Sequence, residues 1–561
     1  MNDIRRTILW VIFGFSMILL WDQWQIYNGK AATFFPSPAK TATAPAAAAS
    51  AAVPTASTAA VPATAKTGAT APVVTAETPA AKREKVVVST DVLKLGFDTE
   101  GATLERAELL KHKEEGAGVK SPEKRNIVVL DNSKDRVYLA QTGLVGTAGY
   151  PTHKTVFNQV AGPRELKDGQ DELKIRFESP EVGGLKLVKT YTLKRGAYDI
   201  AVQHDIQNVS AGTQNAQLYV QLLRDGNKPP GESSFYSTFT GPAVYTTEKK
   251  FEKVEFSDIE KGKAEFQKTT SAGYAAMVQH YFASAWLMAD GVQRDMFMRK
   301  TDTNLYSVGM ITAAQAIEPG TSKTVEARLF VGPQEEKKLE ALYPGLELVK
   351  DYGWLTILAK PLYWLVDKLH GMLGNWGWSI VALVVLLKIA FYWLNASAYR
   401  SMAKMKEVNP RVMELRERLK DKPQEMQQAM MKLYRDEKVN PMGGCFPIVI
   451  QIPVFIALYW VLLATVEMRN APWLGWITDL SSPDPYFILP LVMTGTTLLQ
   501  TWLNPTPPDP VQAKLMWIMP LVFSVMFFFF PSGLVLYWLT NNILSIAQQY
   551  MINKQMGVLN K

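Results

Sequence analysis

Hydrophobic residues are concentrated in long, almost uncharged runs in the C-terminal part of the chain. The run at 374–394 holds a single charged residue, Lys388, among about twenty that are mostly apolar. An α-helix of about twenty residues crosses a bilayer core of roughly 30 Å, so this run predicts a transmembrane helix. Four later runs predict further transmembrane helices, at 443–466, 486–504, 513–530 and 534–553. A Pro-Ser-Gly turn at 531–533 separates the last two.

The first 28 residues contain one more apolar run, which follows Arg5 and Arg6. Such a segment is either a cleaved signal peptide or an uncleaved anchor. Its end is rich in Trp and Tyr, and it lacks a cleavage site with small residues, so residues 1–28 predict a transmembrane anchor. The sequence therefore predicts a polytopic α-helical membrane protein with six transmembrane helices.

The part between the anchor and the later runs has two regions that differ in amino-acid composition. Residues 29–83 are largely Ala, Pro and Thr, which cannot form a hydrophobic core, so we expect a disordered linker. Residues 84–345 contain alternating or β-branched runs that predict strands, including a hairpin at 185–208 that turns near Arg195 and Gly196. The other expected strands are 92–97, 126–130, 136–141, 173–178, 217–223, 275–288, 305–311 and 324–331. Many strands without long helices between them predict an all-β sandwich domain.

Residues 350–372 predict an amphipathic helix. Leucines at 355, 358, 362, 365 and 369 form one stripe, and the charged residues Lys360, Asp367 and Lys368 lie off it. A helix of this kind suits the membrane interface. The alternative is that it packs under the soluble domain.

Residues 395–442 predict a helical hairpin, because two charged amphipathic stretches are interrupted at Pro423. The hairpin is rich in methionine, whose flexible side chain can adapt to varied partners, although the methionines could equally form the core of the hairpin. The candidate recruitment residues are Met402, Met405, Met413, Met426 and Met430. A basic face could also meet anionic lipid or RNA, but the hairpin has no specific nucleic-acid motif.

Basic residues are distributed unevenly between the predicted loops. The hairpin has eleven Lys or Arg and seven Asp or Glu, whereas the loop at 467–485 has one basic residue. Because cytoplasmic loops carry the excess of Lys and Arg, the hairpin is predicted to be cytoplasmic, with the β-rich domain across the membrane. The short loop at 505–512, the tail at 554–561 and both termini are then cytoplasmic.

The residues that support common enzyme chemistry are scarce. A single cysteine, Cys445, excludes an intrachain disulfide and a cysteine-based metal cluster, and the chain has five histidines without an HExxH motif. It also lacks a Walker nucleotide-binding motif. His204 beside Asp205 and His280 beside Tyr281 resemble acid/base pairs, but such histidines in strands are usually structural. We therefore predict no catalytic residue, no metal and no cofactor.

Lys388 is the residue in the predicted transmembrane helices that most directly suggests a function. A cation inside an apolar helix is costly and marks a candidate site, unless its side chain extends to the membrane surface. Val384 and Tyr392 share its helix face. Polar residues of other helices that could face it are Gln451, Thr494, Thr497, Gln500, Asn541 and Asn542. Together they predict a polar groove, although such groups often only bond a neighbouring helix.

Four motifs resemble one known family. They are GNWGWSI at 374–380, SMAKMKEVNP at 401–410, NPMGGCFPIVIQIPVFIALYW at 440–460 and FPSGLVLYW at 530–538. These stretches look like the YidC/Oxa family of membrane protein insertases, in the Gram-negative branch with a large periplasmic domain.

The resemblance implies a periplasmic β-supersandwich and a hydrophilic groove that is open to the cytoplasm and to lipid but closed to the periplasm. It implies insertion and folding of nascent proteins in the bacterial inner membrane, alone or with the Sec translocon (SecYEG and SecDF). The ribosome, the signal recognition particle pathway and anionic lipid are the other implied partners. The hairpin would serve substrate recruitment.

At the groove itself, the family's arginine corresponds to Lys388, which keeps the charge but not the guanidinium. A groove threonine of close relatives corresponds to Val384, and an aromatic contact in the last helix corresponds to Tyr537 and Trp538. The resemblance therefore implies an electrostatic role for Lys388.

Two other classes of function remain open at the level of the sequence. A transporter or channel would need several charged intramembrane residues and a repeated half-topology, and the sequence shows one such charge and no inverted repeat. An anchored periplasmic enzyme or sugar-binding protein would leave the apolar C-terminal helices and the basic hairpin unexplained.

Overall fold

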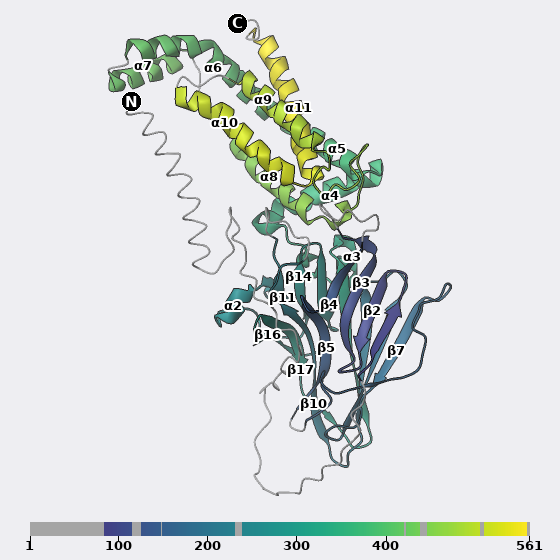
Figure 1. Ribbon diagram of the computed structural model, residues 1–561. Helices are drawn as coiled ribbons and strands as arrows, with labels where there is room; N and C mark the ends of the chain where they lie inside the picture. The colour runs from purple at the N-terminus through teal and green to yellow at the C-terminus, as the bar shows by residue number, and fades with distance from the viewer. Residues whose placement is uncertain are drawn as a thin grey trace. The chain divides into compact units, whose positions relative to one another are not determined.

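The computed structural model describes residues 83–114, 125–146, 149–229, 238–419, 422–437, 446–504 and 510–557 (Figure 1). The predicted anchor at 1–28, all of the linker at 29–83 except its last residue, and Cys445 lie outside these residues. Within the described part, the chain forms two compact units. The β-rich unit extends to Lys350, and the helical unit begins at Asp351.

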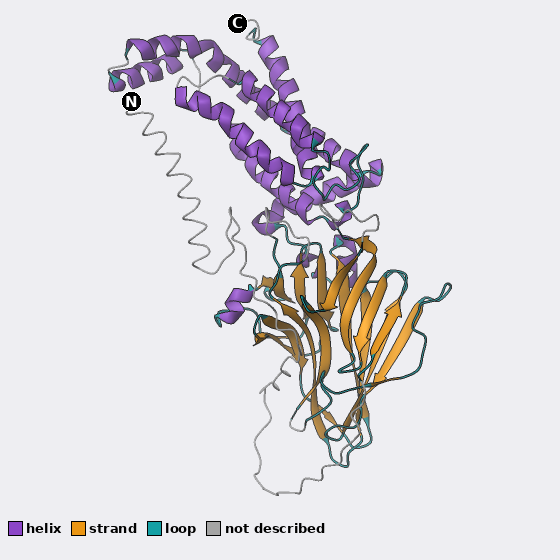
Figure 2. Cartoon of the chain, viewed as in Figure 1, coloured by secondary structure: helices purple, strands orange, loops and turns teal. Residues whose placement is uncertain are grey.

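The β-rich unit contains two antiparallel sheets (Figure 2). Among the described residues the first sheet has ten strands, in the order β1-β2-β3-β4-β5-β10-β17-β16-β13, with β18 paired to β10. Its strands are β1 (Lys85–Ser89), β2 (Leu93–Asp98), β3 (Thr103–Lys113), β4 (Asn126–Asn132), β5 (Val137–Val145), β10 (Gln214–Asp225), β13 (Thr269–Thr270), β16 (Arg294–Asp302), β17 (Leu305–Thr312) and β18 (Gln315–Ile317).

The second sheet has nine strands in the described part, in the order β12-β11-β14-β15-β19-β9-β8-β7-β6. These are β6 (Asn158–Gln159), β7 (Glu172–Glu178), β8 (Leu185–Lys194), β9 (Asp199–Asn208), β11 (Gly241–Thr246), β12 (Lys250–Lys253), β14 (Gly273–Gln279), β15 (Phe282–Leu287) and β19 (Ser322–Pro333). Short helices α2 (Phe256–Glu260), α3 (Glu336–Leu342) and η1 (Leu346–Val349) complete the unit.

The sheets pack face to face through β10 and β17 of the first and β11, β14 and β15 of the second. Along β7 and β9, buried and exposed side chains alternate, as expected for strands with one face on a core. Trp286 on β15 is almost fully buried, and its Nε1 donates to the Gln221 carbonyl oxygen at 3.0 Å. The unit is therefore the β-sandwich that the sequence predicts.

A buried polar network also joins the sheets. Lys189 of β8 donates to the carbonyl oxygens of Gly101 at 2.6 Å and Thr142 at 2.8 Å. The Thr142 hydroxyl lies 3.0 Å from Nε2 of His204. Burial lowers the pKa of Lys189 to about 7, while burial and the Lys189 charge lower the pKa of His204 to about 3.

The prediction of a single strand at 275–288 is wrong. The structure has two antiparallel strands here, β14 and β15, joined at His280 and Tyr281. The turn contains no Gly, Pro, Asn or Asp, and Tyr281 itself adopts a positive φ of 66°. Every residue of both strands is buried, so neither strand shows an alternation of apolar and polar residues that would mark its end. The predicted hairpin at 185–208 is confirmed, with β8 and β9 on either side of Gly196.

In its described residues, the helical unit is built from α-helices with two 3-10 turns between them and one before them. Its elements are η2 (Gly353–Leu355), α4 (Thr356–Leu373), α5 (Trp376–Ala390), α6 (Tyr392–Arg418), α7 (Pro423–Asp436), α8 (Phe446–Ala464), η3 (Val466–Met468), α9 (Ile488–Leu503), α10 (Pro510–Met526), η4 (Phe527–Phe529) and α11 (Ser532–Gln555). An apolar core joins α4, α5, α8, α9 and α11, and includes Ile380, Leu458 and Val535.

The amphipathic helix α4 buries a face that differs slightly from the predicted leucine stripe. Its most buried side chains are Ala359, Tyr363 and Val366, while Leu358 is 38% exposed. The buried side of α4 packs against α5 and α8. Both contacts lie within the helical unit.

Within the described residues, no single helix is both long and apolar enough to cross a membrane by length and composition. Helices α5 and α6 meet the criterion together, but they are bent by 69°. Shorter apolar helices cover Gln451–Ala464, Ile488–Leu503 and Ala513–Phe529. The predicted number of six transmembrane helices is therefore not confirmed, and the first of them lies outside the described residues.

The structure also differs from the sequence at the junction between the predicted helix at 374–394 and the hairpin at 395–442. Helix α5 ends at Ala390, Phe391 forms the break, and α6 begins at Tyr392. No glycine or proline lies at the break, so the apolar pattern predicted one straight helix across it. This bend places Phe391 beside the cavity described next.

Candidate functional site

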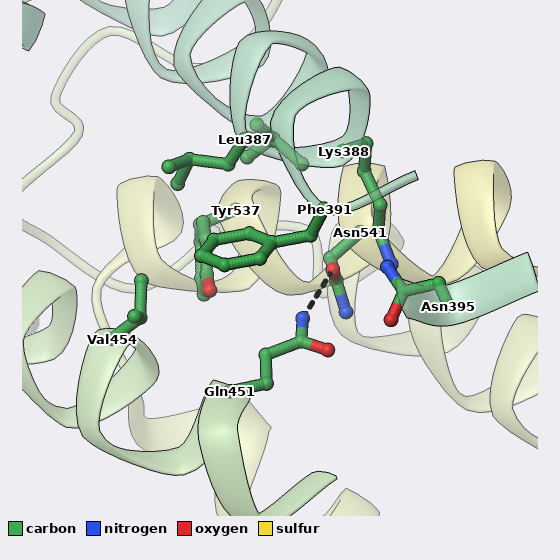
Figure 3. Close-up of a pocket in the computed structure, with 9 residues that line it drawn as sticks. Leu387, Lys388, Phe391, Asn395, Gln451, Val454, Tyr537 and Asn541 are labelled. Carbon is green, nitrogen blue, oxygen red and sulfur yellow. Dashed lines mark hydrogen bonds between the residues drawn. The ribbon is translucent and has the colours of Figure 1, made fainter. Parts of the chain in front are cut away.

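A small cavity lined by both polar and apolar side chains lies between α5, α6, α8 and α11 (Figure 3). It has a volume of about 20 Å³, which is enough for about one water molecule. Its lining residues are Val384, Leu387, Lys388, Phe391, Asn395, Gln451, Val454, Tyr537 and Asn541. Four helices therefore place a cation and three amides around one small space.

A larger pocket of about 370 Å³ shares Asn395, Gln451 and Asn541 with the small cavity. It is also lined by Ala398, Tyr399, Met402, Ile452, Phe455, Gln500, Asn504, Trp538 and Ser545. The shared amides connect the two spaces into one polar region, which we call the groove. Aromatic rings close one side, where Phe455 lies 4.5 Å from Trp538 between ring centroids.

Lys388 is held in the groove by a hydrogen bond to the last helix. Its Nζ donates to Oγ of Ser545 at 2.7 Å, and that hydroxyl donates to the backbone carbonyl oxygen of Asn541 at 2.7 Å. Figure 3 shows the Lys388 side chain extending from α5 toward Asn395 and Asn541. The ammonium therefore points into the groove and contacts a neutral hydroxyl, which leaves its charge uncompensated by this contact.

Hydrogen bonds from amide side chains connect α8, α9 and α11. Nε2 of Gln451 donates to Oδ1 of Asn541 at 3.2 Å (Figure 3). Between α9 and α11, Asn542 donates to Thr497 at 3.0 Å and Gln549 donates to Asn504 at 3.0 Å. Each of these hydrogen bonds pairs polar atoms that would be costly to bury among apolar side chains without a partner.

The structure brings together seven of the eight groove residues that the sequence suggested. Five line the small cavity: Val384, Lys388, Gln451, Tyr537 and Asn541. Gln500 and Trp538 line the larger pocket. Tyr392 lines neither, since the bend at Phe391 turns its side chain outward and leaves it 52% exposed.

Sequence reasoning missed Ser545, Phe391 and Asn504. Ser545 lies seven residues, or about two helical turns, after Trp538, so the helical period could have placed it near the same face. Phe391 depends on the bend, for which the sequence holds no signal.

The five candidate methionines of the hairpin occupy different environments. Helices α6 and α7 lie side by side (Figure 1), around a small core of Val408 and Val412. Met405 and Met430 pack against this core. Met413 is half exposed, Met426 is partly buried, and Met402 lines the larger pocket.

The β-rich unit does not assemble the acid/base pairs that the sequence contains. His204 is fully buried between the sheets, whereas Asp205 points to the opposite face of β9 and accepts from Thr324 at 2.6 Å. The imidazole of His280 stacks on the ring of Tyr281, with the centroids 3.7 Å apart. Within the described part of the chain, no group of three or more His, Cys, Asp or Glu residues could hold a metal ion.

Comparison with known proteins gives matches over nearly the whole chain. The family described as YidC periplasmic domain matches residues 85–365, and the family described as 60Kd inner membrane protein matches residues 368–558. The chain is 54% identical to Membrane protein insertase YidC of Ralstonia nicotianae, covering 100% of this chain and 99% of that protein. Its identity to the protein of the same name from Cupriavidus necator is 55%, over 99% of this chain and 98% of that one.

A solved structure described as an active YidC insertase, with the first transmembrane domain resolved, aligns with 84% of this chain and 93% of its own. The TM-score is 0.39 at 19% identity. By the two family matches, this chain is an inner-membrane protein, the β-rich unit is its periplasmic domain, and the helices from α5 onward lie in the part that matches the 60Kd inner membrane protein family. The chain belongs to the YidC family of membrane protein insertases, which are not enzymes.

Proposed function

We propose that the groove around Lys388 carries the polar segments of nascent membrane proteins while the insertase places their apolar segments in the inner membrane. The observation that supports this most is the position of the ammonium. It lies in a space lined by Asn395, Gln451 and Asn541, within helices that are otherwise apolar. A charge in such a place is expensive to maintain and marks a functional site.

The driving force follows from elementary transfer energetics. A polar tail that crosses hydrocarbon loses its hydration, and a polar groove shortens the path over which that loss occurs. The apolar segment of the same substrate gains roughly 25 cal/mol for each Å² that leaves water for lipid. Apolar transfer therefore drives the step, and no nucleotide is needed.

Ser545 gives Lys388 a partner that a substrate can replace. A neutral hydroxyl binds the ammonium more weakly than a carboxylate does, because the carboxylate adds the attraction of an opposite charge. An acidic residue of the tail can therefore displace Ser545 from Lys388. This exchange favours substrates whose translocated tails carry Asp or Glu.

Replacing Ser545 by alanine is expected to change insertion only mildly. Lys388 loses its 2.7 Å hydrogen bond and keeps its charge, so acidic tails still bind it. We expect insertion to change by no more than about threefold, in keeping with the 0.6 kcal/mol typical of such interhelical bonds. Reconstituted insertion with an acidic-tail substrate measures the effect, and a loss as large as that of Lys388→Ala would show that Ser545 does more than hold the lysine.

Site-specific crosslinking tests where the substrate passes. We expect a photoreactive residue at Asn541, which lines both spaces of the groove, to crosslink a stalled nascent chain. The matched control is Ile543, two residues further along α11, which is 48% exposed and lines neither space. Preferential crosslinking of the polar tail at position 543 would refute the proposed path.

The topology proposed with this function has six transmembrane helices and both termini in the cytoplasm. The hairpin of α6 and α7 then lies in the cytoplasm, where its excess of Lys and Arg suits the positive-inside rule and anionic lipid. Helix α4 would lie at the periplasmic membrane surface, since its Trp364 is exposed and its buried face is already occupied.

The substrates of the insertase are membrane proteins. We propose that the hairpin receives them, and that the half-exposed Met413 offers an adaptable apolar contact. Ribosomes, the signal recognition particle pathway and the Sec translocon (SecYEG and SecDF) are the proposed suppliers of these chains. The basic surface of the hairpin supports an encounter with the ribosome and the signal recognition particle, whose RNA is anionic.

A further inference from the structure

The connection between α8 and α9, residues 465–487, is folded into the end of the helical unit. Ile477 and Leu480 are almost fully buried and belong to the same apolar core as the helices. The loop therefore packs as part of the bundle.

Two buried aspartates hold the loop in its conformation. Oδ1 of Asp479 accepts from the backbone N–H of Asn470 at 2.9 Å and of Ser481 at 2.9 Å, and from the Ser481 hydroxyl at 2.7 Å. Its Oδ2 accepts from the Ser482 hydroxyl at 2.9 Å. The single carboxylate thus joins both ends of the segment 470–482.

Asp484 is 1% exposed and fixes the loop to α9. Oδ1 accepts from Nε1 of Trp476 at 3.0 Å and from the backbone N–H of Tyr486 at 3.0 Å. Oδ2 accepts from the N–H of Leu489 at 2.7 Å, in the first turn of the helix. A buried carboxylate is tolerated only with several such donors, and those of Asp484 come from the loop and from the first turn of α9, so the carboxylate holds the two together.

Further hydrogen bonds tie the loop to the first turns of α5 and α11. Nδ2 of Asn375 donates to the carbonyl oxygens of Pro472 and Trp473, at 3.2 Å in both cases. On α11, the backbone N–H and the hydroxyl of Ser532 both donate to the Ser482 carbonyl oxygen at 2.8 Å.

Trp473 lies directly over the α5 backbone. A Cβ added at Gly377 would come within 2.2 Å of the Trp473 side chain. Only glycine permits this close approach.

The loop covers the end of the bundle that is opposite to the groove. Gly377 and Lys388 are eleven residues apart on α5, or about 16 Å along the axis. Buried apolar residues fill the interval, including Ile380, Leu383 and Leu534. The groove and the loop thus lie on opposite sides of an apolar layer.

We propose that the loop at 465–487 is a permeability seal and that Asp479 and Asp484 are its positioning residues. The proposal rests on the proposed function, because a seal is needed only where a hydrated groove opens to the other side of the membrane. A groove that admits polar tails also admits water and ions, so the remaining barrier must be closed independently of the substrate. The buried carboxylates keep it closed by fixing the loop onto α5, α9 and α11.

Ion leakage through reconstituted full-length protein tests this. Liposomes that contain Asp484→Ala and enclose a pH-sensitive dye are expected to lose an imposed proton gradient about five times faster than liposomes with the original protein, or more. Asp168→Ala is the matched control, since Asp168 is exposed in the β-rich unit. It should leak no faster than the original protein.

Gly377→Ala provides a second variant that leaves both carboxylates in place and displaces Trp473. If Gly377→Ala can be reconstituted into liposomes and Asp484→Ala cannot, the proton leak through Gly377→Ala tests the seal instead. Leakage by neither variant above the Asp168→Ala control would overturn the seal. Lys388→Ala separates this result from the proposed function: it should lower insertion without raising leakage, and normal insertion by Lys388→Ala would contradict the groove and leave the leak result standing.

Discussion

Replacing Lys388 by alanine is expected to reduce the insertion of proteins with acidic translocated tails about tenfold, which corresponds to a barrier higher by about 1.4 kcal/mol. The ammonium lies in the groove at hydrogen-bond distance from Ser545, where salt and water screen its attraction less than at a surface. Lys388→Arg should preserve insertion, because the charge remains. Proteoliposomes that contain each variant, assayed by protease protection of the tail, give the comparison.

Lys323→Ala is the matched control for this prediction. Lys323 lies on β19 of the β-rich unit and is exposed, so its removal changes the net charge equally without altering the groove or the hairpin. If Lys323→Ala lowers insertion as much as Lys388→Ala, the effect comes from the total charge of the protein and not from the groove.

Replacing Lys189 by methionine is expected to remove most of the pH dependence of periplasmic-domain stability between pH 7 and 9. The pKa of Lys189 is about 7 in the folded domain and returns to its ordinary value of 10.5 on unfolding. As the pH rises from 7 to 9, the folded domain loses this proton while the unfolded chain keeps it, so the unfolded chain binds up to one proton more and stability rises with pH. The expected gain for the original protein is about 2 kcal/mol, at about 1.4 kcal/mol per pH unit above the folded pKa.

Urea unfolding of residues 83–350 at several pH values measures this, with Trp286 as reporter because it is the only tryptophan in that range. Methionine retains the aliphatic stem but not the amine. Lys186→Met is the control on the same strand, since Lys186 is exposed and should leave the pH slope unchanged. A Lys189→Met domain that gains as much stability with pH as the original protein would rule out Lys189 as the source.

The sequence predicted the β-sandwich best at strands such as β1, β7 and β9, which expose one face and show clear alternation. The hairpin of β8 and β9 is a good case, with a positive-φ glycine at its turn. The sequence failed at β14 and β15, where all residues are buried and the turn at Tyr281 uses none of the usual turn residues. Such a turn is determined by the surrounding core and leaves no local signal.

The candidate groove was predictable in part, because its polar residues stand out within apolar helices. Charge and polarity inside apolar helices mark Lys388, Gln451 and Asn541 without any structure. Which residues meet depends on the rotation and offset of the helices, and a single sequence does not encode these in a readable form. That is why Ser545, the hydrogen-bond partner of Lys388, was missed, and why Tyr392 was included although the bend turns it away.

The hairpin methionines show the limit of composition as an argument. The same residue type predicted both a partner surface and an internal core. The structure uses Met405 and Met430 for the core and leaves Met413 half exposed. Only the packing of α6 on α7 separates the two uses.

A double-mutant cycle between Lys388 and the charge of the substrate tail tests most directly whether the groove acts electrostatically. Lys388 and Lys388→Ala proteins are each given two substrates that differ only by Asp or Asn in the translocated tail, and the four insertion rates are measured. We expect the Asp substrate to lose about tenfold with Lys388→Ala and the Asn substrate to lose less than about twofold, a coupling of roughly 1 kcal/mol. Equal losses for the two substrates would contradict an electrostatic role for Lys388.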